Sequence, residues 1–360
     1  MNYILMNKDE PWLFFESSCD EFDEVHLTEK KWLTELRPWG YADLYSFIES
    51  RKAPKHRKHM EMLFERYGCS DTEGFLRVTH SLSLNDTFWV KEEQSSLSWN
   101  DVSLYTNEFD EVAAHTAFDG FDGSTEFSST SPEFGTDGYY AKCWIREKGD
   151  IFLCKSGSST FEVEPLSEFL ASQVAEIICP ESVRYELSFL HGKLISKCRL
   201  FTSEKHGFVK AAGIFGERKT VSELLNYYEK SGNGDFFRRM CILDALILNT
   251  DRHYGNFGML ADNESMKLVG AAPVFDNNRS LCFDLDSDQL KNPEWYIKRC
   301  RPAFGADFIS TARGVMTDEI RNDLINMKGF RLKQHESIRA DQQRLDLLSD
   351  LICGQIGRIV

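Results

Sequence analysis

The chain has 360 residues, a formal net charge of −15 and an apolar content of 42%. This length allows two or three domains with sizeable cores, and the negative charge argues against nucleic-acid binding, which needs a basic face. No run of eighteen apolar residues is present, and the N-terminus lacks the basic and apolar parts of a signal peptide. The ten cysteines are scattered without a Cys-x-x-Cys pair, which favours reduced thiols in a cytoplasmic protein.

Residues 1–110 are expected to form an N-terminal accessory subdomain, because they match no pattern that we can place residue by residue. The pattern predicts a strand at 12–15 and helices at 41–49 and 59–67, followed by strands or short turns at 82–91 and 97–105. Between the helices lies a basic cluster, which we interpret as a solvated helix face. Its members are Arg51, Lys52, Lys55, Arg57 and Lys58.

Residues 111–205 are predicted to form a β-rich N-lobe. Gly, Ser, Thr and Asp are frequent at 117–138, which indicates a loop. Strands at 140–145 and 150–155 flank a polar turn and predict an antiparallel hairpin. Pro165 marks the start of a helix, and strands in 184–211 complete the sheet. The apolar stripe of that helix is Leu166, Phe169, Leu170, Val174 and Ile177.

Residues 206–360 are predicted to form a helical C-lobe. Helices are expected at 221–230, at 236–248 and within 315–357. Two strands at 257–260 and 267–270 enclose a polar turn. A β-rich region followed by helices gives an α+β fold with the two-lobed layout of protein kinases, and the second of these helices would deliver the loop that follows it.

That loop carries the most informative motif of the chain, Asn249-Thr250-Asp251-Arg252-His253-Tyr254-Gly255-Asn256. Four residues separate Asp251 from Asn256, and a second carboxylate, Asp276, lies twenty positions further on. A kinase uses one Asp to orient the attacking hydroxyl, and an Asn and another Asp to hold Mg²⁺ against the nucleotide phosphates. The spacing therefore predicts a phosphoryl-transfer site.

Each part of this motif also has an ordinary structural interpretation. Asn249 and Asp251 are typical of a helix-ending turn, since their side chains bond the local backbone. His253 is compatible with a packed core histidine, and Asp276-Asn277-Asn278 with a simple turn. The combination, in this order and after an apolar helix, favours the kinase interpretation.

The nucleotide side of the site is less well marked. The chain has no Walker A sequence, which disfavours a P-loop NTPase. The segment Gly135-Thr136-Asp137-Gly138 is compatible with a phosphate-covering loop and equally with an ordinary turn. Lys155 ends a predicted strand, where a kinase keeps its phosphate-contacting lysine. Its acidic partner is expected from the next helix, at Glu168 or Glu164.

Together these residues resemble the HipA-like serine/threonine kinases of bacteria. The resemblance lies within residues 135–276. It rests on Asn249-x-Asp251-x-His253-x-x-Asn256, Phe275-Asp276, Gly138-x-x-x-Lys142, Lys155 and Ser167-Glu168-Phe169-Leu170. The Gly-rich segment lacks the Ser and Ala-Gly neighbours usual in the family, which argues against loop-mediated self-inhibition. Members of the family can autophosphorylate in this loop, and the resemblance does not choose between Thr136 and Ser131 for that role.

The resemblance implies a role for each matching residue. Asp251 would be the catalytic base, with His253 supporting the loop, and Asn256 and Asp276 would hold Mg²⁺. ATP would be bound through a wider set of residues. These are Lys155, Gly138, Lys142, Glu168, Phe201 and Thr202, the last two beside the adenine. The acceptor would be a Ser/Thr hydroxyl of a protein, and an antitoxin-like partner would have to be a separate protein.

Two other functions use the same residues. A small-molecule kinase similar to aminoglycoside phosphotransferases would need the same Lys, Asp, Asn and Asp. A nucleotide-binding interaction module without catalysis would also bind ATP, although a complete catalytic set favours an active enzyme. Phosphoryl transfer to a protein hydroxyl is the function that we expect from the sequence.

Overall fold

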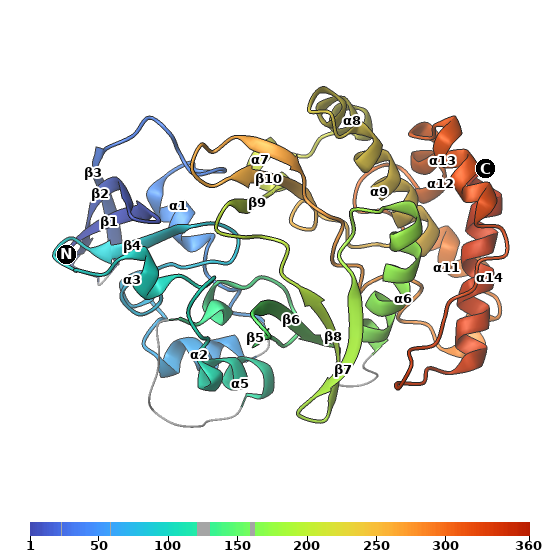
Figure 1. Cartoon of the computed structure of the whole chain (residues 1–360), viewed down its shortest axis with the longest axis horizontal. Helices are drawn as coiled ribbons and strands as arrows, with labels where there is room; N and C mark the ends of the chain where they lie inside the picture. Colours follow the sequence, from blue (N-terminus) through green and yellow to red (C-terminus); the bar gives the residue numbers. More distant parts are fainter. Residues whose placement is uncertain (23, 58, 121–129, 159–162) are drawn as a thin grey trace. The chain divides into compact units, whose positions relative to one another are not determined.

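The computed structural model describes residues 1–22, 24–57, 59–120, 130–158 and 163–360. Contacts divide the chain into two compact units, each built from three segments (Figure 1). Unit 1 comprises Met1–Lys155, Leu200–Val209 and Leu260–Val269, and unit 2 comprises Ser156–Arg199, Lys210–Met259 and Gly270–Val360. The ranges 1–110, 111–205 and 206–360 proposed from the sequence stay predictions.

Unit 1 begins with an antiparallel sheet in the order β3-β2-β1-β4. Its strands are β1 (Asn2–Asn7), β2 (Glu10–Cys19), β3 (Val25–Trp32) and β4 (Phe88–Glu92). Leu13, Phe15 and Ser17 are buried at alternate positions of β2, as expected for a strand with one face on the core. The strand predicted at 12–15 is confirmed, and β2 extends beyond these apolar residues on both sides.

Five helices accompany this sheet in the described part of unit 1. They are α1 (Leu44–Glu49), α2 (Met60–Arg66), α3 (Thr72–Thr79), α4 (Trp99–Val102) and α5 (Glu111–Asp119). Asp43, Asp71 and Asp110 cap α1, α3 and α5 by accepting a bond from a first-turn N–H group. Aromatic side chains from sheet and helices share one buried cluster, which includes Phe15, Phe47 and Phe75.

The prediction of a strand or short turn at 97–105 is wrong for Trp99–Val102, which form α4. Ser98 and Asp101 make a capping box, in which the backbone N–H of Ser98 donates to the Asp101 carboxylate at 2.8 Å. Reciprocal capping stabilises even a single helical turn. Aromatic content therefore misled the prediction, because the local hydrogen bonds decide this segment.

The interpretation of the basic cluster as a solvated helix face is wrong for its two arginines. Arg51 is 6% exposed and donates to both carboxylate oxygens of Asp86, at 2.7 and 2.9 Å. Arg57 is 1% exposed and donates to the backbone carbonyls of Glu133 and Thr136. Both side chains bind carbonyl groups of loops inside unit 1, and Lys58 lies outside the described residues.

The predicted hairpin after the Gly-rich segment is confirmed as β5 (Lys142–Glu147) and β6 (Asp150–Ser156), an antiparallel pair. The loop predicted at 117–138 is partly wrong, because 117–119 end α5 and Pro132–Gly135 form a 3₁₀ turn. Residues 121–129 lie outside the described residues.

Two later segments return to unit 1. The strands β9 (His206–Lys210), β10 (Gly258–Asp262) and β11 (Leu268–Ala271) form a sheet in the order β11-β10-β9. The Asn7 amide donates to the Asn263 carbonyl at 2.6 Å, and the Trp39 indole donates to the Met266 carbonyl at 2.9 Å. These bonds attach the β10–β11 turn to the N-terminal part of unit 1.

Unit 2 contains a second antiparallel hairpin, β7 (Tyr185–Leu190) and β8 (Lys193–Arg199). Its helices lie in three groups along the chain, separated by strands (Figure 1). They are α6 (Val163–Ile178), α7 (Ala211–Phe215), α8 (Val221–Lys230), α9 (Gly234–Ile247), α10 (Ser287–Leu290), α11 (Glu294–Arg299), α12 (Phe308–Gly314), α13 (Asp318–Asn326) and α14 (Gln342–Ile359). Antiparallel sheets and a helical region confirm the predicted α+β class.

The apolar stripe predicted for α6 is wrong at its end, since Ile177 is 46% exposed. Ile178 is buried instead, and the buried face also carries Ser167 and Glu168. Polar residues therefore occupy core positions of α6, which an apolar pattern cannot reveal.

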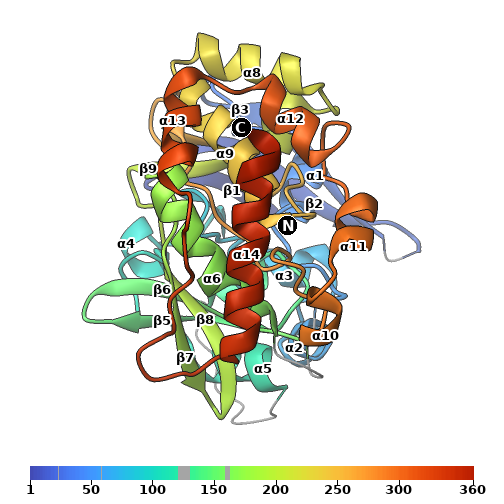
Figure 2. The same cartoon turned by 90° about the vertical axis from the view of Figure 1, so that its right-hand side faces the viewer.

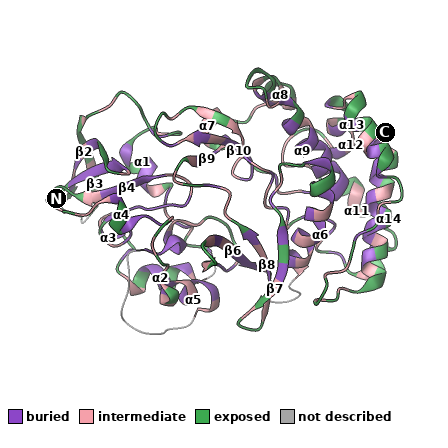
Figure 3. Ribbon diagram, viewed as in Figure 1, coloured by how far each residue is buried: buried purple, intermediate pink, exposed green. Residues whose placement is uncertain are grey.

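Helix α9 is the centre of unit 2 and is buried along almost its whole length (Figure 3). Helix α14 runs beside it (Figure 2), where the Gln355 amide donates to the Ala245 carbonyl at 2.9 Å. The Tyr228 hydroxyl of α8 donates to the Gly258 carbonyl at 3.2 Å. Among the described residues, no helix is long and apolar enough to cross a membrane.

Candidate active site

The candidate catalytic loop begins where α9 ends. Leu248 adopts a left-handed conformation with φ of +53° and closes the helix. The Asn249 side chain then accepts a bond from the Asp251 N–H at 3.0 Å. The buried helix thus ends in a turn that Asn249 stabilises, two residues before Asp251.

The loop is closed by bonds between its own residues. The Asn256 side-chain nitrogen donates to the Asp251 carbonyl at 2.9 Å, and the Asn256 N–H donates to the His253 carbonyl at 2.8 Å. Because the nitrogen of the Asn256 amide donates a hydrogen bond within the loop, the oxygen of this amide is the atom that can coordinate a cation. His253 is exposed, and its ring accepts a bond from the Gly255 N–H at 3.0 Å.

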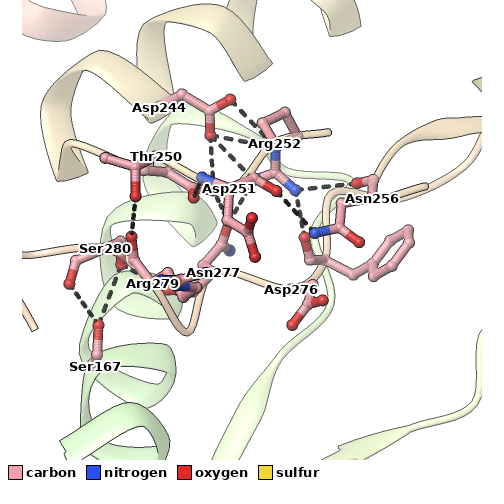
Figure 4. Close-up of polar contacts among 12 residues, drawn as sticks. Ser167, Asp244, Thr250, Asp251, Arg252, Asn256, Asp276, Asn277, Arg279 and Ser280 are labelled. Carbon is pink, nitrogen blue, oxygen red and sulfur yellow. Dashed lines mark hydrogen bonds and ion pairs between the residues drawn. The ribbon is translucent and has the colours of Figure 1, made fainter. Parts of the chain in front are cut away.

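Arg252 joins this loop to the segment that carries Asp276. Its guanidinium is 1% exposed and lies 3.0 Å from the Asp244 carboxylate of α9. It also donates to the Asn256 carbonyl at 3.1 Å, to the Phe275 carbonyl and to the Asn277 side chain. Figure 4 shows Arg252 between Asp244 on one side and the segment with Asp276 and Asn277 on the other.

The Asp244–Arg252 pair is an uncommon feature. Asp244 lies in the last turn of α9, where the helix dipole disfavours a carboxylate. Burial raises the pKa of Asp244, and the positive charge of Arg252 opposes that rise. Burial would lower the pKa of Arg252, but the charge and hydrogen bonds of Asp244 outweigh it and the pKa is raised. Each group therefore favours the charged form of the other.

Asp276 lies in a sharply turned segment. Its φ is +57°, a left-handed conformation that few residues other than glycine adopt. The preceding Val274 makes backbone bonds with Glu181 and Val183, at 2.9 and 2.8 Å. After it, the Ser167 hydroxyl of α6 donates to the Ser280 carbonyl at 2.8 Å. The segment is thus held on both sides of Asp276.

The three predicted catalytic side chains are close enough to interact. Figure 4 shows Asp251, Asn256 and Asp276 grouped beside Arg252. Burial raises the pKa of Asp251, the charges of His253 and Arg279 lower it, and the negative charge of Asp276 raises it further. The Asp276 carboxylate and the Asn256 amide oxygen are the kind of donors that suit Mg²⁺, which prefers oxygen ligands.

Three of the predicted nucleotide residues of unit 1, Gly138, Lys142 and Lys155, lie on or beside one hairpin. Lys142 and Lys155 are opposite each other in the β5–β6 register, 7% and 6% exposed. The Lys142 ammonium donates to the Asp137 carbonyl at 2.6 Å, across Gly138, whose φ is +111°. A Cβ at Gly138 would lie 2.0 Å from the Lys142 nitrogen, so glycine permits this close approach.

The remaining predicted residues have structural partners. Glu168 is fully buried and accepts a bond from the Ser196 hydroxyl at 2.5 Å, while Glu164 accepts from the Ser158 N–H at 2.9 Å. The Phe201 ring packs edge-on against Phe208, with centroids 5.5 Å apart. The Thr202 hydroxyl donates to the Leu84 carbonyl at 2.5 Å.

The hydroxyls considered for autophosphorylation are both engaged. Ser131 is 4% exposed and donates to the Glu133 carboxylate at 2.7 Å. The Thr136 hydroxyl donates to the Pro132 carbonyl at 2.7 Å and accepts from the Trp144 indole at 2.8 Å. Either residue would have to leave these partners to reach a nucleotide.

Sequence reasoning missed the residues that support the site. Asp244, Asn277 and Tyr185 were not singled out, and Arg252 was read only as part of the motif. For Asp244 there is one local signal, its position one turn before the end of an apolar helix. A buried carboxylate at that place predicts a cationic partner nearby. Nothing in the sequence marks Tyr185.

A cavity of about 590 Å³ lies elsewhere in unit 2, where the ends of α6, α9 and α13 meet. Cys179, Glu181, Phe236, Arg239 and Asp323 are among its lining residues. None of the predicted site residues lines it, so this cavity is separate from the candidate active site.

A helix that delivers an Asp–Asn loop, followed by a hairpin and a second Asp, defines a kinase-like arrangement, and comparison with solved structures agrees. The chain is similar to HipA of Shewanella oneidensis MR-1, solved with HipB and operator DNA, with a TM-score of 0.53 and 11% identity over 99% of this chain and 96% of that chain. This likeness confirms the predicted kinase-like fold and the resemblance to HipA at the level of the fold.

Another similar structure is the proinflammatory kinase CtkA of Helicobacter pylori. The TM-score is 0.46 and the identity 15%, over 61% of this chain and 90% of that chain. No protein-family model matches the chain, and no curated protein sequence matches it.

Proposed function

We propose that this protein is a kinase that transfers the γ-phosphoryl group of ATP to a Ser/Thr hydroxyl of a protein in the presence of Mg²⁺. The observation that carries the proposal is the grouping of Asp251, Asn256 and Asp276, joined by the buried contacts of Arg252. A fold similar to HipA supports it. A cytoplasmic location is part of the proposal and agrees with ten free cysteines.

In this reaction Asp251 accepts the proton of the acceptor hydroxyl. The hydroxyl oxygen forms a bond to the γ-phosphorus, the bond from that phosphorus to the bridging oxygen breaks, and ADP leaves with the electron pair. Asn256 and Asp276 would hold the metal, which would supply positive charge against the phosphates. Among the remaining predicted residues, Lys155 would contact the phosphates, with Lys142 and Gly138 beside it.

The test is transfer of radiolabelled γ-phosphate by the full-length protein, alone, with a basic protein acceptor and with a panel of small hydroxyl compounds. We expect label on protein that EDTA and Asp276→Asn both abolish. Asn suits the left-handed backbone at this position and removes only the charge. Label on small compounds alone would indicate a small-molecule kinase, and bound nucleotide without transfer would indicate a non-catalytic module.

Replacing Lys155 by Met is expected to reduce the transfer rate about 10²-fold, the typical effect of removing one group that stabilises charge on the reacting phosphates. The matched control is Lys148→Met in the turn of the same hairpin, which should retain the wild-type rate. Steady-state rates over a range of ATP concentrations measure the effect. A wild-type rate in Lys155→Met would remove this residue from the site.

The HipA structure that the chain resembles contains HipB and DNA. As part of the proposal, this protein would also act with a protein partner of the antitoxin type. Co-purification of a neighbouring gene product with the full-length protein would test this, and a protein that is always recovered alone would speak against it.

A further inference from the structure

Two buried side chains bind opposite ends of a single peptide bond, the one that joins Phe275 to Asp276. The Phe275 carbonyl accepts a hydrogen bond from Arg252, and the Asp276 N–H donates one to the Tyr185 hydroxyl at 3.0 Å. Arg252 is 1% and Tyr185 3% exposed, so water has little access to compete for these bonds. Both polar groups of one peptide plane are thus held by side chains distant in sequence.

This peptide plane carries the backbone nitrogen from which the Asp276 Cα and side chain extend. The φ of Asp276 is the rotation about the bond from that nitrogen to the Cα, and it is +57°. A change of φ to a negative value, the more common backbone conformation, would turn the Cβ and its carboxylate about this bond to a new direction. Holding the plane by both of its polar groups therefore limits where the carboxylate can lie.

The surrounding chain explains how Tyr185 reaches this peptide. Glu181 and Val183 make backbone bonds with Val274, at 2.9 and 2.8 Å, and so place β7 directly after them beside Asp276. Arg252 arrives from the other side, fixed by Asp244 at 3.0 Å. The plane is therefore held by two elements that are themselves held in place.

We infer that Tyr185 and Arg252 are positioning residues that hold the Phe275–Asp276 peptide in the one orientation that directs the Asp276 carboxylate to the metal. This inference rests on the proposed function. Tyr185 is the residue to test, because Arg252 has other partners and its loss would disturb the whole loop. Groups that orient a metal ligand typically contribute 10- to 100-fold to metal affinity or activity.

The experiment compares Tyr185→Phe with Tyr228→Phe in the full-length protein. Each variant keeps its ring and loses only its hydroxyl, but the Tyr228 hydroxyl donates to the Gly258 carbonyl, whereas the Tyr185 hydroxyl accepts from the Asp276 N–H. Binding of Mn²⁺ is followed by electron paramagnetic resonance with a non-hydrolysable ATP analogue present. Thermal unfolding by circular dichroism reports the structural loss separately.

Tyr185→Phe is expected to raise the Mn²⁺ concentration for half-saturation about tenfold, while Tyr228→Phe binds Mn²⁺ like the wild type. The Mg²⁺ concentration for half-maximal transfer should rise in parallel. Unchanged Mn²⁺ binding in Tyr185→Phe, or an equal rise in both variants, would overturn the inference while leaving the kinase proposal intact. A wild type that binds neither Mn²⁺ nor the nucleotide analogue would overturn the proposed function, and this inference with it.

Discussion

Asp251→Asn is expected to lower the phosphoryl-transfer rate by about 10²–10⁴-fold, the typical contribution of a positioned base. Asn is nearly isosteric, so the bonds from the Asp251 backbone to Asn249 and Asn256 should persist. The amide cannot accept the proton of the acceptor hydroxyl. The fold is therefore expected to survive while the chemical step is lost.

The measurement is the single-turnover rate with radiolabelled ATP, together with nucleotide affinity and the melting temperature. Asp288→Asn is the matched control, because Asp288 is an exposed aspartate of α10 whose side chain pairs only locally with Lys291. We expect wild-type rates in that control. An Asp251→Asn enzyme that transfers phosphate at the wild-type rate would remove Asp251 from the role of base.

Arg252→Met is expected to produce the largest loss of stability, about 3–5 kcal/mol in the free energy of unfolding. The substitution leaves Asp244 as an uncompensated carboxylate that is only 4% exposed, and it leaves the Asn256 and Phe275 carbonyls without their donor. A buried charge that loses its partner costs far more than the loss of a surface ion pair.

Urea unfolding of Arg252→Met and Arg238→Met tests this expectation. Arg238 pairs with Glu229, which is 48% exposed, and donates to the Val315 carbonyl at 2.9 Å, so its loss should cost about 1–2 kcal/mol, less than that of the buried pair. The double variant Asp244→Leu/Arg252→Met removes the unpaired charge and is expected to recover part of the loss. Equal urea midpoints in the two single variants would show that the buried pair is not what stabilises the loop.

The sequence predicted the candidate catalytic residues of the site, but not the residues that hold them in place. Asp251, Asn256 and Asp276 could be predicted because phosphoryl transfer requires those groups at a recognisable spacing. Tyr185 and Asp244 could not, because their contacts depend on which distant segments meet. The bond from Asp276 to Tyr185 joins residues 91 positions apart, and no local pattern encodes such a pairing.

The helices and strands, too, were only partly predictable from the sequence. Hairpin β5–β6 was predictable from two β-rich runs around a polar turn, and helix α8 from the helical pattern that ends at Lys230. Strand β3 was not, since Val25–Trp32 are mostly exposed and carry no alternating apolar face. The basic cluster was misjudged because composition cannot tell a solvated arginine from one that binds buried carbonyls, as Arg51 does with Ser81 and Phe88.

The three-segment construction of unit 1 has a consequence for how the protein is made. The Asn7 amide bonds to the carbonyl of Asn263, a residue 256 positions later. A ribosome adds roughly 5–20 residues per second, so the N-terminal sheet waits roughly 10–50 s for this partner. During synthesis, Met1–Lys155 therefore exists for a time without the segment Leu260–Val269 that completes its unit. The nascent chain is expected to need protection over this interval, and production in cells should improve when translation is fast or chaperones are abundant.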